Sequence, residues 1–165
     1  MRRLQERAPL LVFLASAGAL VGALTAQFGF GLRPCILCLY QRGPYVAAAV
    51  LGLLAVVARL PNRVRSGLLA LCALAFFVNV GVAAFHTGVE RHWWAGTTAC
   101  VGGQPDVTSI EDLQAQLSGP PPARCDEIPW SLFGLSMTNY NLPASLALGL
   151  FSAWAALGLR RKEDA

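Results

Sequence analysis

The sequence predicts an all-α membrane protein, a four-transmembrane-helix bundle, and three observations support this prediction. Only 13% of the 165 residues are charged, against about 25% in ordinary soluble domains, while 55% are hydrophobic. The apolar residues gather in four runs, each close to the roughly 20 residues that a spanning helix needs. A soluble helical bundle would show a polar stripe every three to four residues, and these runs show almost none. We therefore expect residues 1–165 to form a single integral membrane domain.

The four expected spans cover about residues 10–30, 39–58, 68–85 and 142–159. Basic residues precede the first run, as they do in a secretory signal, but no convincing small-x-small cleavage site closes it. We therefore interpret this run as a retained first helix. Its removal would change the helix count and leave the orientation of the other three spans unchanged.

The distribution of charge predicts the orientation, because short cytoplasmic loops carry an excess of Lys and Arg. Nine of the thirteen basic residues fall in the N-terminus, in the connection at 59–67 and in the C-terminal tail. Six of the nine acidic residues fall in the two opposite loops, about 31–41 and 86–141. Both termini are therefore expected to be cytoplasmic. The asymmetry explains the net charge of +4, and no basic patch with interleaved aromatic residues indicates nucleic-acid binding.

The second outer loop is expected to contain a short amphipathic helix. Thr108 and Glu111 have capping-box spacing, and Gly119 with the three prolines after it ends the segment. The apolar residues that recur near one helical face are Val107, Ile110, Leu113 and Leu117. The sequence leaves two placements open, on the membrane surface or packed on the loop itself.

Four of the five cysteines fall in the two outer loops: Cys35, Cys38, Cys100 and Cys125. Cys72 lies inside the third span and is interpreted as an inert buried thiol, because a thiolate would be costly there. A Cys100–Cys125 bond would close 26 residues and stabilise the fold by roughly 3.5 kcal/mol. A Cys35–Cys38 bond closes only four residues, for about 2 kcal/mol at best. The Cys-x-x-Cys pair is therefore better suited to opening and closing than to stapling.

The position of the Cys-x-x-Cys pair favours redox use. The second span begins beside Cys35 and Cys38, so unpaired amides and the positive dipole end of a helix would stabilise a thiolate. Arg42 follows Cys38 by four residues and either adds positive charge on the same helical face or anchors the interface by reaching the headgroups. Pro44 implies that the helix either starts near Gly43 or is kinked there.

A metal site is the rival chemical use of such a pair. His86 and His92 are separated from it by a whole hairpin and show no ligand spacing. The sequence therefore predicts no metal centre.

Three further features carry a family resemblance. The second span opens with Pro34-Cys35-Ile36-Leu37-Cys38-Leu39-Tyr40-Gln41-Arg42, and a second cysteine pair follows in the next outer loop. His86 stands at the end of the third span, and Phe133-Gly134-Leu135-Ser136-Met137 precedes the fourth. Over nearly its whole length the chain thus resembles the DsbB family, in which a similar Leu-Gly-Leu-x-Met stretch precedes the last helix.

This resemblance implies an enzyme that re-oxidises a periplasmic, DsbA-like protein of thioredoxin fold and passes the electrons to a membrane quinone, either ubiquinone or menaquinone. Cys100 would be attacked by the donor's thiolate, and Cys125 would be the sulfur released. Cys35 and Cys38 would then take the electrons, with Cys38 facing the quinone. The resemblance implies a multi-pass protein of the bacterial inner membrane with both cysteine loops in the periplasm and the lipid bilayer around its spans.

The resemblance also implies a quinone site formed by Cys38, Arg42 and His86. Arg42 would stabilise negative charge on the thiolate and the reduced quinone, and His86 would donate or accept a hydrogen bond near the ring. Gln41 stands where some members carry an acid, so no role is assigned to it.

Two other functions compete with this one. A vitamin K epoxide reductase-like enzyme also combines four cysteines with a quinone, but there the loop pair precedes the Cys-x-x-Cys, and here Cys35 and Cys38 come first. A four-span scaffold could use Cys100 and Cys125 as a loop staple. Such a scaffold has no use for Cys35, Cys38 and Arg42 at the membrane edge.

Overall fold

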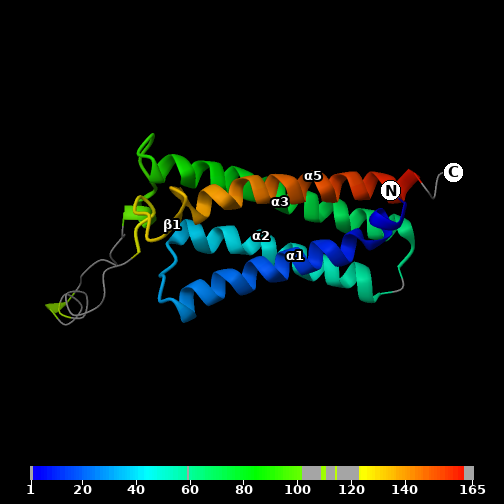
Figure 1. Cartoon of the computed structure of the whole chain (residues 1–165), viewed down its shortest axis with the longest axis horizontal. Coiled ribbons are helices and arrows are strands. Elements are labelled where there is room, and N and C mark those ends of the chain that lie inside the picture. The colour runs from blue at the N-terminus through cyan, green and yellow to red at the C-terminus, as the bar shows by residue number, and fades with distance from the viewer. Residues whose placement is uncertain (1, 59, 102–108, 111–113, 115–122, 162–165) are drawn as a thin grey trace.

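The computed structural model describes residues 2–58, 60–101, 109–110, 114 and 123–161. Its elements in chain order are helices α1 (Arg2–Gly29), α2 (Ile36–Val57) and α3 (Asn62–Glu90), the 3-10 helix η1 (Thr98–Val101), strands β1 (Ser131–Leu132) and β2 (Leu135–Ser136), and helix α5 (Met137–Arg161). The four long helices alternate in direction, so both chain termini lie at one end of the bundle (Figure 1). We call the opposite end, which holds Cys35, Cys38, Cys100 and Cys125, the cysteine end.

All four long helices are long and apolar enough to cross a membrane. Between 22% and 33% of their most apolar stretches is buried inside the bundle, so most of this hydrophobic surface faces outward. In water that surface would be costly, and in lipid it is the expected outer surface. Together these features confirm the predicted four-span bundle.

The helix bounds differ from the expected ones, because the expectation followed the apolar runs alone. Polar residues extend α1 at its N-terminus, which begins at Arg2, and extend α3 at both ends, from Asn62 to Glu90. The connection expected at 59–67 is therefore too long, because Pro61 is already the N-cap of α3. Pro suits a helix start, where its missing N–H has no partner to lose. The two loops at the cysteine end shorten to 30–35 and 91–136.

The expected amphipathic helix falls on a segment of which only residues 109, 110 and 114 are described. Its placement stays a prediction. A small hairpin of β1 and β2 precedes α5, with Ser131 paired to Ser136 and Leu132 to Leu135. Its two turn residues, Phe133 and Gly134, have φ values of 51° and 76°, as a two-residue type I′ turn requires. This hairpin was not predicted.

The bundle core lies between the helices toward the end that holds the termini. Phe76 and Tyr45 meet edge to face there, with ring centroids 5.6 Å apart. Cys72 is fully buried in this core, as expected, and its thiol lies 3.8 Å from the Ala48 carbonyl oxygen. A second buried cluster sits at the cysteine end and packs Leu37 and Val89 around three of the cysteines. The candidate site is built in that cluster.

Candidate active site

The N-terminus of α2 presents the Cys-x-x-Cys pair. Cys35 is the N-cap of the helix, and its sulfur accepts a hydrogen bond from the Cys38 backbone N–H at 3.3 Å. The Cys35 thiol donates to the Cys38 sulfur at 2.9 Å. α2 begins at Ile36, so a start near Gly43 is wrong, and Pro44 lies inside the helix. The Cys35 sulfur therefore satisfies one of the free amides of the first turn, and the Cys38 sulfur lies next to it.

The second pair lies beside the first, on η1 and on the loop before β1. The Cys125 backbone N–H donates to the Cys100 carbonyl oxygen at 3.1 Å, and both side chains are buried. Burial, and then the neighbouring Cys100 sulfur, raise the pKa of the Cys125 thiol, while the Leu37 backbone N–H opposes this rise. Cys125 thus sits between its own partner and the N-terminus of α2.

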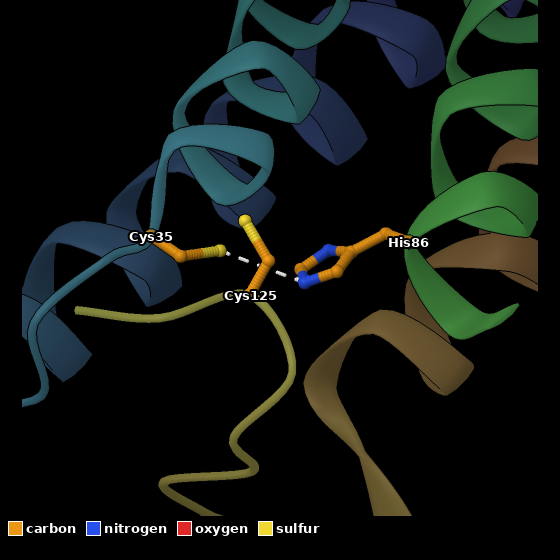
Figure 2. A group of neighbouring side chains, drawn as sticks. All are labelled: Cys35, His86 and Cys125. Atoms are coloured by element: carbon orange, nitrogen blue, oxygen red, sulfur yellow. Dashed lines mark hydrogen bonds between the residues drawn. The ribbon is translucent and has the colours of Figure 1, made fainter. Parts of the chain in front are cut away.

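Cys35, His86 and Cys125 meet at the centre of the site. Their sulfur and ring-nitrogen atoms all lie within 4.8 Å of one another, and all three side chains are buried. Figure 2 shows them converging from the start of α2, from α3 and from the loop that carries Cys125. The α2–α3 hairpin does separate His86 from the Cys-x-x-Cys pair along the chain, but the two helices pack side by side and return His86 to the cysteine end. The separation in sequence therefore did not exclude a contact in space.

His86 makes contacts on both sides of its ring. Nε2 lies 3.5 Å from the Cys35 sulfur and 3.7 Å from a carboxylate oxygen of Glu90. Nδ1 lies 2.9 Å from Gln41 Nε2 and 3.1 Å from Thr138 Oγ1. The His86 contact lowers the pKa of the Cys35 thiol, but the hydrogen bond to Cys38 and burial outweigh it and raise that pKa to about 12.

A cavity of about 630 Å³ opens beside these groups. Small and apolar residues of α1, including Ala19 and Ala23, form one wall, and aromatic residues of the loop and α5 contribute to another. Its polar groups include Cys38, Arg42 and His86. A mostly apolar cavity of this size with a few polar groups is the usual form of a site for a small organic molecule.

The structure turns Arg42 toward α1 and the cavity. One guanidinium nitrogen donates to Gln27 Oε1 at 2.6 Å, and the other lies 3.5 Å from the Ala23 carbonyl oxygen. Among the described residues, no carboxylate lies within 4.0 Å of this guanidinium. The hydrogen-bond partners of Arg42 are therefore neutral, and its side chain lines the same cavity as Cys38.

Sequence reasoning missed the polar groups that hold His86. Gln41 and Thr138 contact the ring, Asn141 contacts Gln41, and Glu90 accepts a hydrogen bond from the Ser136 hydroxyl at 2.5 Å. The sequence feature that could have identified these residues is a polar residue at or near an apolar run, since such residues in membrane helices face the bundle interior. Nothing in the sequence indicated which of them would meet.

Comparison with known proteins finds similarity over most of the chain. The family model for disulfide bond formation protein DsbB matches residues 5–155. The chain is 33% identical over 156 residues to disulfide bond formation protein B of Methylobacillus flagellatus, and the aligned region covers 92% of each chain. It is 32% identical over 161 residues to the protein of the same name from Xanthomonas axonopodis, covering 92% of this chain and 90% of the relative.

Proposed function

The chain belongs to the DsbB family of disulfide bond formation proteins, and from this premise we propose that it is a quinone-dependent protein disulfide oxidoreductase. It would lie in the bacterial inner membrane with its cysteine end in the periplasm. There it would oxidise a soluble dithiol protein of thioredoxin fold and deliver two electrons and two protons to a membrane quinone. The observation that carries this proposal is the convergence of both cysteine pairs on one buried cluster.

Electrons would enter at the Cys100–Cys125 disulfide. A thiolate of the donor attacks the Cys100 sulfur, a mixed disulfide forms, and Cys125 is released as a thiolate. The donor's second thiolate then attacks the mixed disulfide, which frees the oxidised donor and leaves two reduced cysteines. Cys100 fits the entry role because it lies on η1 and lines a small second cavity of about 150 Å³ with Trp94 and Asp126.

Transfer between the pairs needs Cys125 to reach the Cys35–Cys38 disulfide. The Cys125 thiolate attacks the Cys35 sulfur, the Cys35–Cys38 bond breaks, and Cys38 leaves as a thiolate with two electrons. The proximity of the Cys35 and Cys125 sulfurs, within 4.8 Å, supports this step. Attack by Cys100 on the Cys35–Cys125 bond then restores the loop disulfide and releases Cys35. Two electrons have moved from one pair to the other.

The cavity beside Cys38 would hold the quinone ring. A quinone supplies the final oxidant, since it accepts two electrons and two protons when it is reduced. Apolar walls suit its ring and tail, and Arg42 provides positive charge where negative charge develops. Cys38 lines the same cavity, which would bring its sulfur next to a quinone bound there.

The proposal separates the two half-reactions, and this separation can be tested. Changing Cys100 or Cys125 to serine should abolish oxidation of the donor protein, while added quinone should still oxidise the reduced Cys35–Cys38 pair. The measurement is quinone consumption by purified membranes, given first a reduced dithiol protein and then a small dithiol. A Cys100→Ser variant that turned over the protein dithiol at the normal rate would exclude this relay. A chain that never consumed quinone would instead be a scaffold with a loop disulfide.

A further inference from the structure

We propose that a chain of side-chain amides holds His86 in the neutral tautomer with its hydrogen on Nε2, which makes it a fixed hydrogen-bond donor to Cys35. His86 is then not a base that removes the Cys35 proton. Gln41 and Asn141 are the positioning residues that impose this state. The tautomer of His86 does not depend on the proposed function. Only the effect of this tautomer on electron transfer rests on the proposed function.

The two sides of the ring face groups of opposite kind. Nε2 faces two acceptors, the Cys35 sulfur at 3.5 Å and a Glu90 carboxylate oxygen at 3.7 Å. The other oxygen of Glu90 accepts from the Ser136 hydroxyl. A lone pair on Nε2 would therefore point at a carboxylate. A hydrogen on Nε2 can instead be donated to the Cys35 sulfur and is attracted by the Glu90 carboxylate, because neutral imidazole donates from one nitrogen and accepts at the other.

Nδ1 faces donors. The Gln41 amide nitrogen lies 2.9 Å from it, and the Thr138 hydroxyl lies 3.1 Å away and can turn its hydrogen toward it. The orientation of the Gln41 amide matters most, since its oxygen would face Nδ1 if the group were turned over. That orientation is set by what the oxygen of Gln41 contacts.

Asn141 determines the orientation of Gln41. Its amide nitrogen donates to Gln41 Oε1 at 2.6 Å. Its oxygen accepts from the Tyr45 hydroxyl at 2.7 Å and lies 3.4 Å from the Asn79 amide nitrogen. Turning Asn141 over would place its NH₂ group against that of Asn79. Donors thus follow one another in a single direction from Asn79 to His86, and the last of them leaves Nδ1 as an acceptor.

This arrangement affects the step in which Cys35 is released. When Cys100 attacks the Cys35–Cys125 bond, Cys35 leaves as a thiolate, and the Nε2 hydrogen is already directed at it. A hydrogen bond to the charged form favours that form. The tautomer also explains why the cluster of Cys35, His86 and Cys125 is not proposed as a metal centre. A metal would need the Nε2 lone pair, which the hydrogen occupies.

The tautomer can be observed by ¹⁵N nuclear magnetic resonance of the reduced full-length protein with labelled histidine. The chain has two histidines, and a His92→Gln variant assigns the His86 signals. We expect the wild type to show a protonated Nε2 and an unprotonated Nδ1. In Gln41→Glu the carboxylate can only accept, so the hydrogen should move to Nδ1. A wild type with hydrogen on Nδ1, or an unchanged tautomer in Gln41→Glu, would overturn the proposal.

A second variant tests the chain at a residue that does not touch His86. In Asn141→Asp the nitrogen that donates to Gln41 becomes an oxygen, while Tyr45 and Asn79 still donate to the new carboxylate. Gln41 should then turn over and draw the hydrogen to Nδ1. Thr138→Val is the matched control, because it removes the other neighbour of Nδ1 and should leave the tautomer as in the wild type. If the His86 tautomer changed in Thr138→Val and stayed as in the wild type in Asn141→Asp, the proposed role of the amide chain would be contradicted.

The consequence for Cys35 is tested by replacing His86 itself. A glutamine amide nitrogen reaches about as far as Nε2, whereas an asparagine nitrogen reaches only as far as Nδ1. We expect the alkylation rate of Cys35 in the fully reduced protein to fall about tenfold in His86→Asn, which corresponds to one pKa unit, and to stay close to wild type in His86→Gln. Equal loss in both variants would show that Nε2 donation is not what Cys35 requires. None of these measurements depends on quinone turnover, so the proposed function can fail while this inference holds.

Discussion

At the scale of single residues, Arg42 and Cys38 show how one helical turn organises the proposed quinone site. Both line the same cavity, and the Arg42 guanidinium has neutral partners on α1. The partly buried Arg42 guanidinium loses some hydration and has no carboxylate within 4.0 Å among the described residues, so we expect it to serve a charge that appears during function. In the proposed reaction, that charge would develop on Cys38 and on the reduced quinone.

Replacing Arg42 by Met should slow quinone reduction and weaken apparent quinone affinity. Hydrogen bonds to charged groups contribute about 1.5–3 kcal/mol, so quinone-dependent turnover should fall by roughly ten- to a hundredfold. Arg42→Lys should recover part of this loss, because it restores the charge without the planar fork. Formation of the mixed disulfide between the donor and Cys100, measured in parallel, should change little. No loss in either reaction would return Arg42 to the role of an interfacial anchor.

The residue scale is also where sequence reasoning was weakest. The Cys-x-x-Cys motif was recognisable because its chemistry is local, and the helix N-terminus beside it followed from the position of the second span. His86 was placed near the quinone by resemblance, but its contact with Cys35 depends on how α2 and α3 pack. Gln41 received no role, since its function depends on Asn141, which lies 100 residues further along the chain.

At the scale of elements, the last turn of α3 supports the loop that carries Cys100. Trp94 folds back over this turn, donates from its indole nitrogen to the Phe85 carbonyl oxygen at 3.0 Å, and stacks on the Phe85 ring. Gly88 lies directly under the indole, where a Cβ atom would overlap Trp94. His92, with a φ of 57°, turns the chain between the helix and Trp94. The loop thus depends on the absence of a side chain at Gly88.

Gly88→Ala should therefore displace Trp94 and slow the exchange between the donor and Cys100. Overpacking of this kind costs about 1–3 kcal/mol, which should appear as a lower midpoint of thermal unfolding. Gly81→Ala is the matched control in the same helix, because nothing lies within 4 Å of a Cβ atom there. It should preserve exchange and stabilise α3 slightly, since Ala is a better helix former than Gly. Equal behaviour of the two variants in exchange and unfolding would contradict the proposed packing.

The elements themselves were predictable to different degrees. All four long helices followed from apolar runs of the right length. Their ends did not, because residues 62–67 and 86–90 are helical without continuing an apolar run that periodicity could detect. The hairpin before α5 has two residues in each strand, too few for an alternating pattern. Phe133 adopts a positive φ that is rare for a bulky side chain, so its turn could not be expected from residue type.

At the scale of the whole molecule, the candidate active site lies at the cysteine end of the bundle and the termini lie at the opposite end (Figure 1). The core around Phe76 and Cys72 separates the cysteine end from the opposite end. Nine of the thirteen basic residues belong to the two terminal segments and to the connection between α2 and α3, so the charge asymmetry follows the long axis of the bundle. A protein with this asymmetry has a preferred orientation in the membrane.

We predict that this orientation places the cysteine end outside the cytoplasm, so that a membrane-impermeant thiol reagent distinguishes the cysteines by position. In reduced spheroplasts, Cys35, Cys38, Cys100 and Cys125 should be labelled once the buried cluster opens, since one membrane face exposes them all. Cys72 should stay unlabelled until the protein is denatured, because it is fully buried in the core of the bundle. A cysteine introduced at Arg161, at the end of α5, should react only after the membrane is permeabilised. Labelling of the position-161 cysteine in sealed spheroplasts, with protection of the other four, would reverse the topology and remove the proposed periplasmic donor.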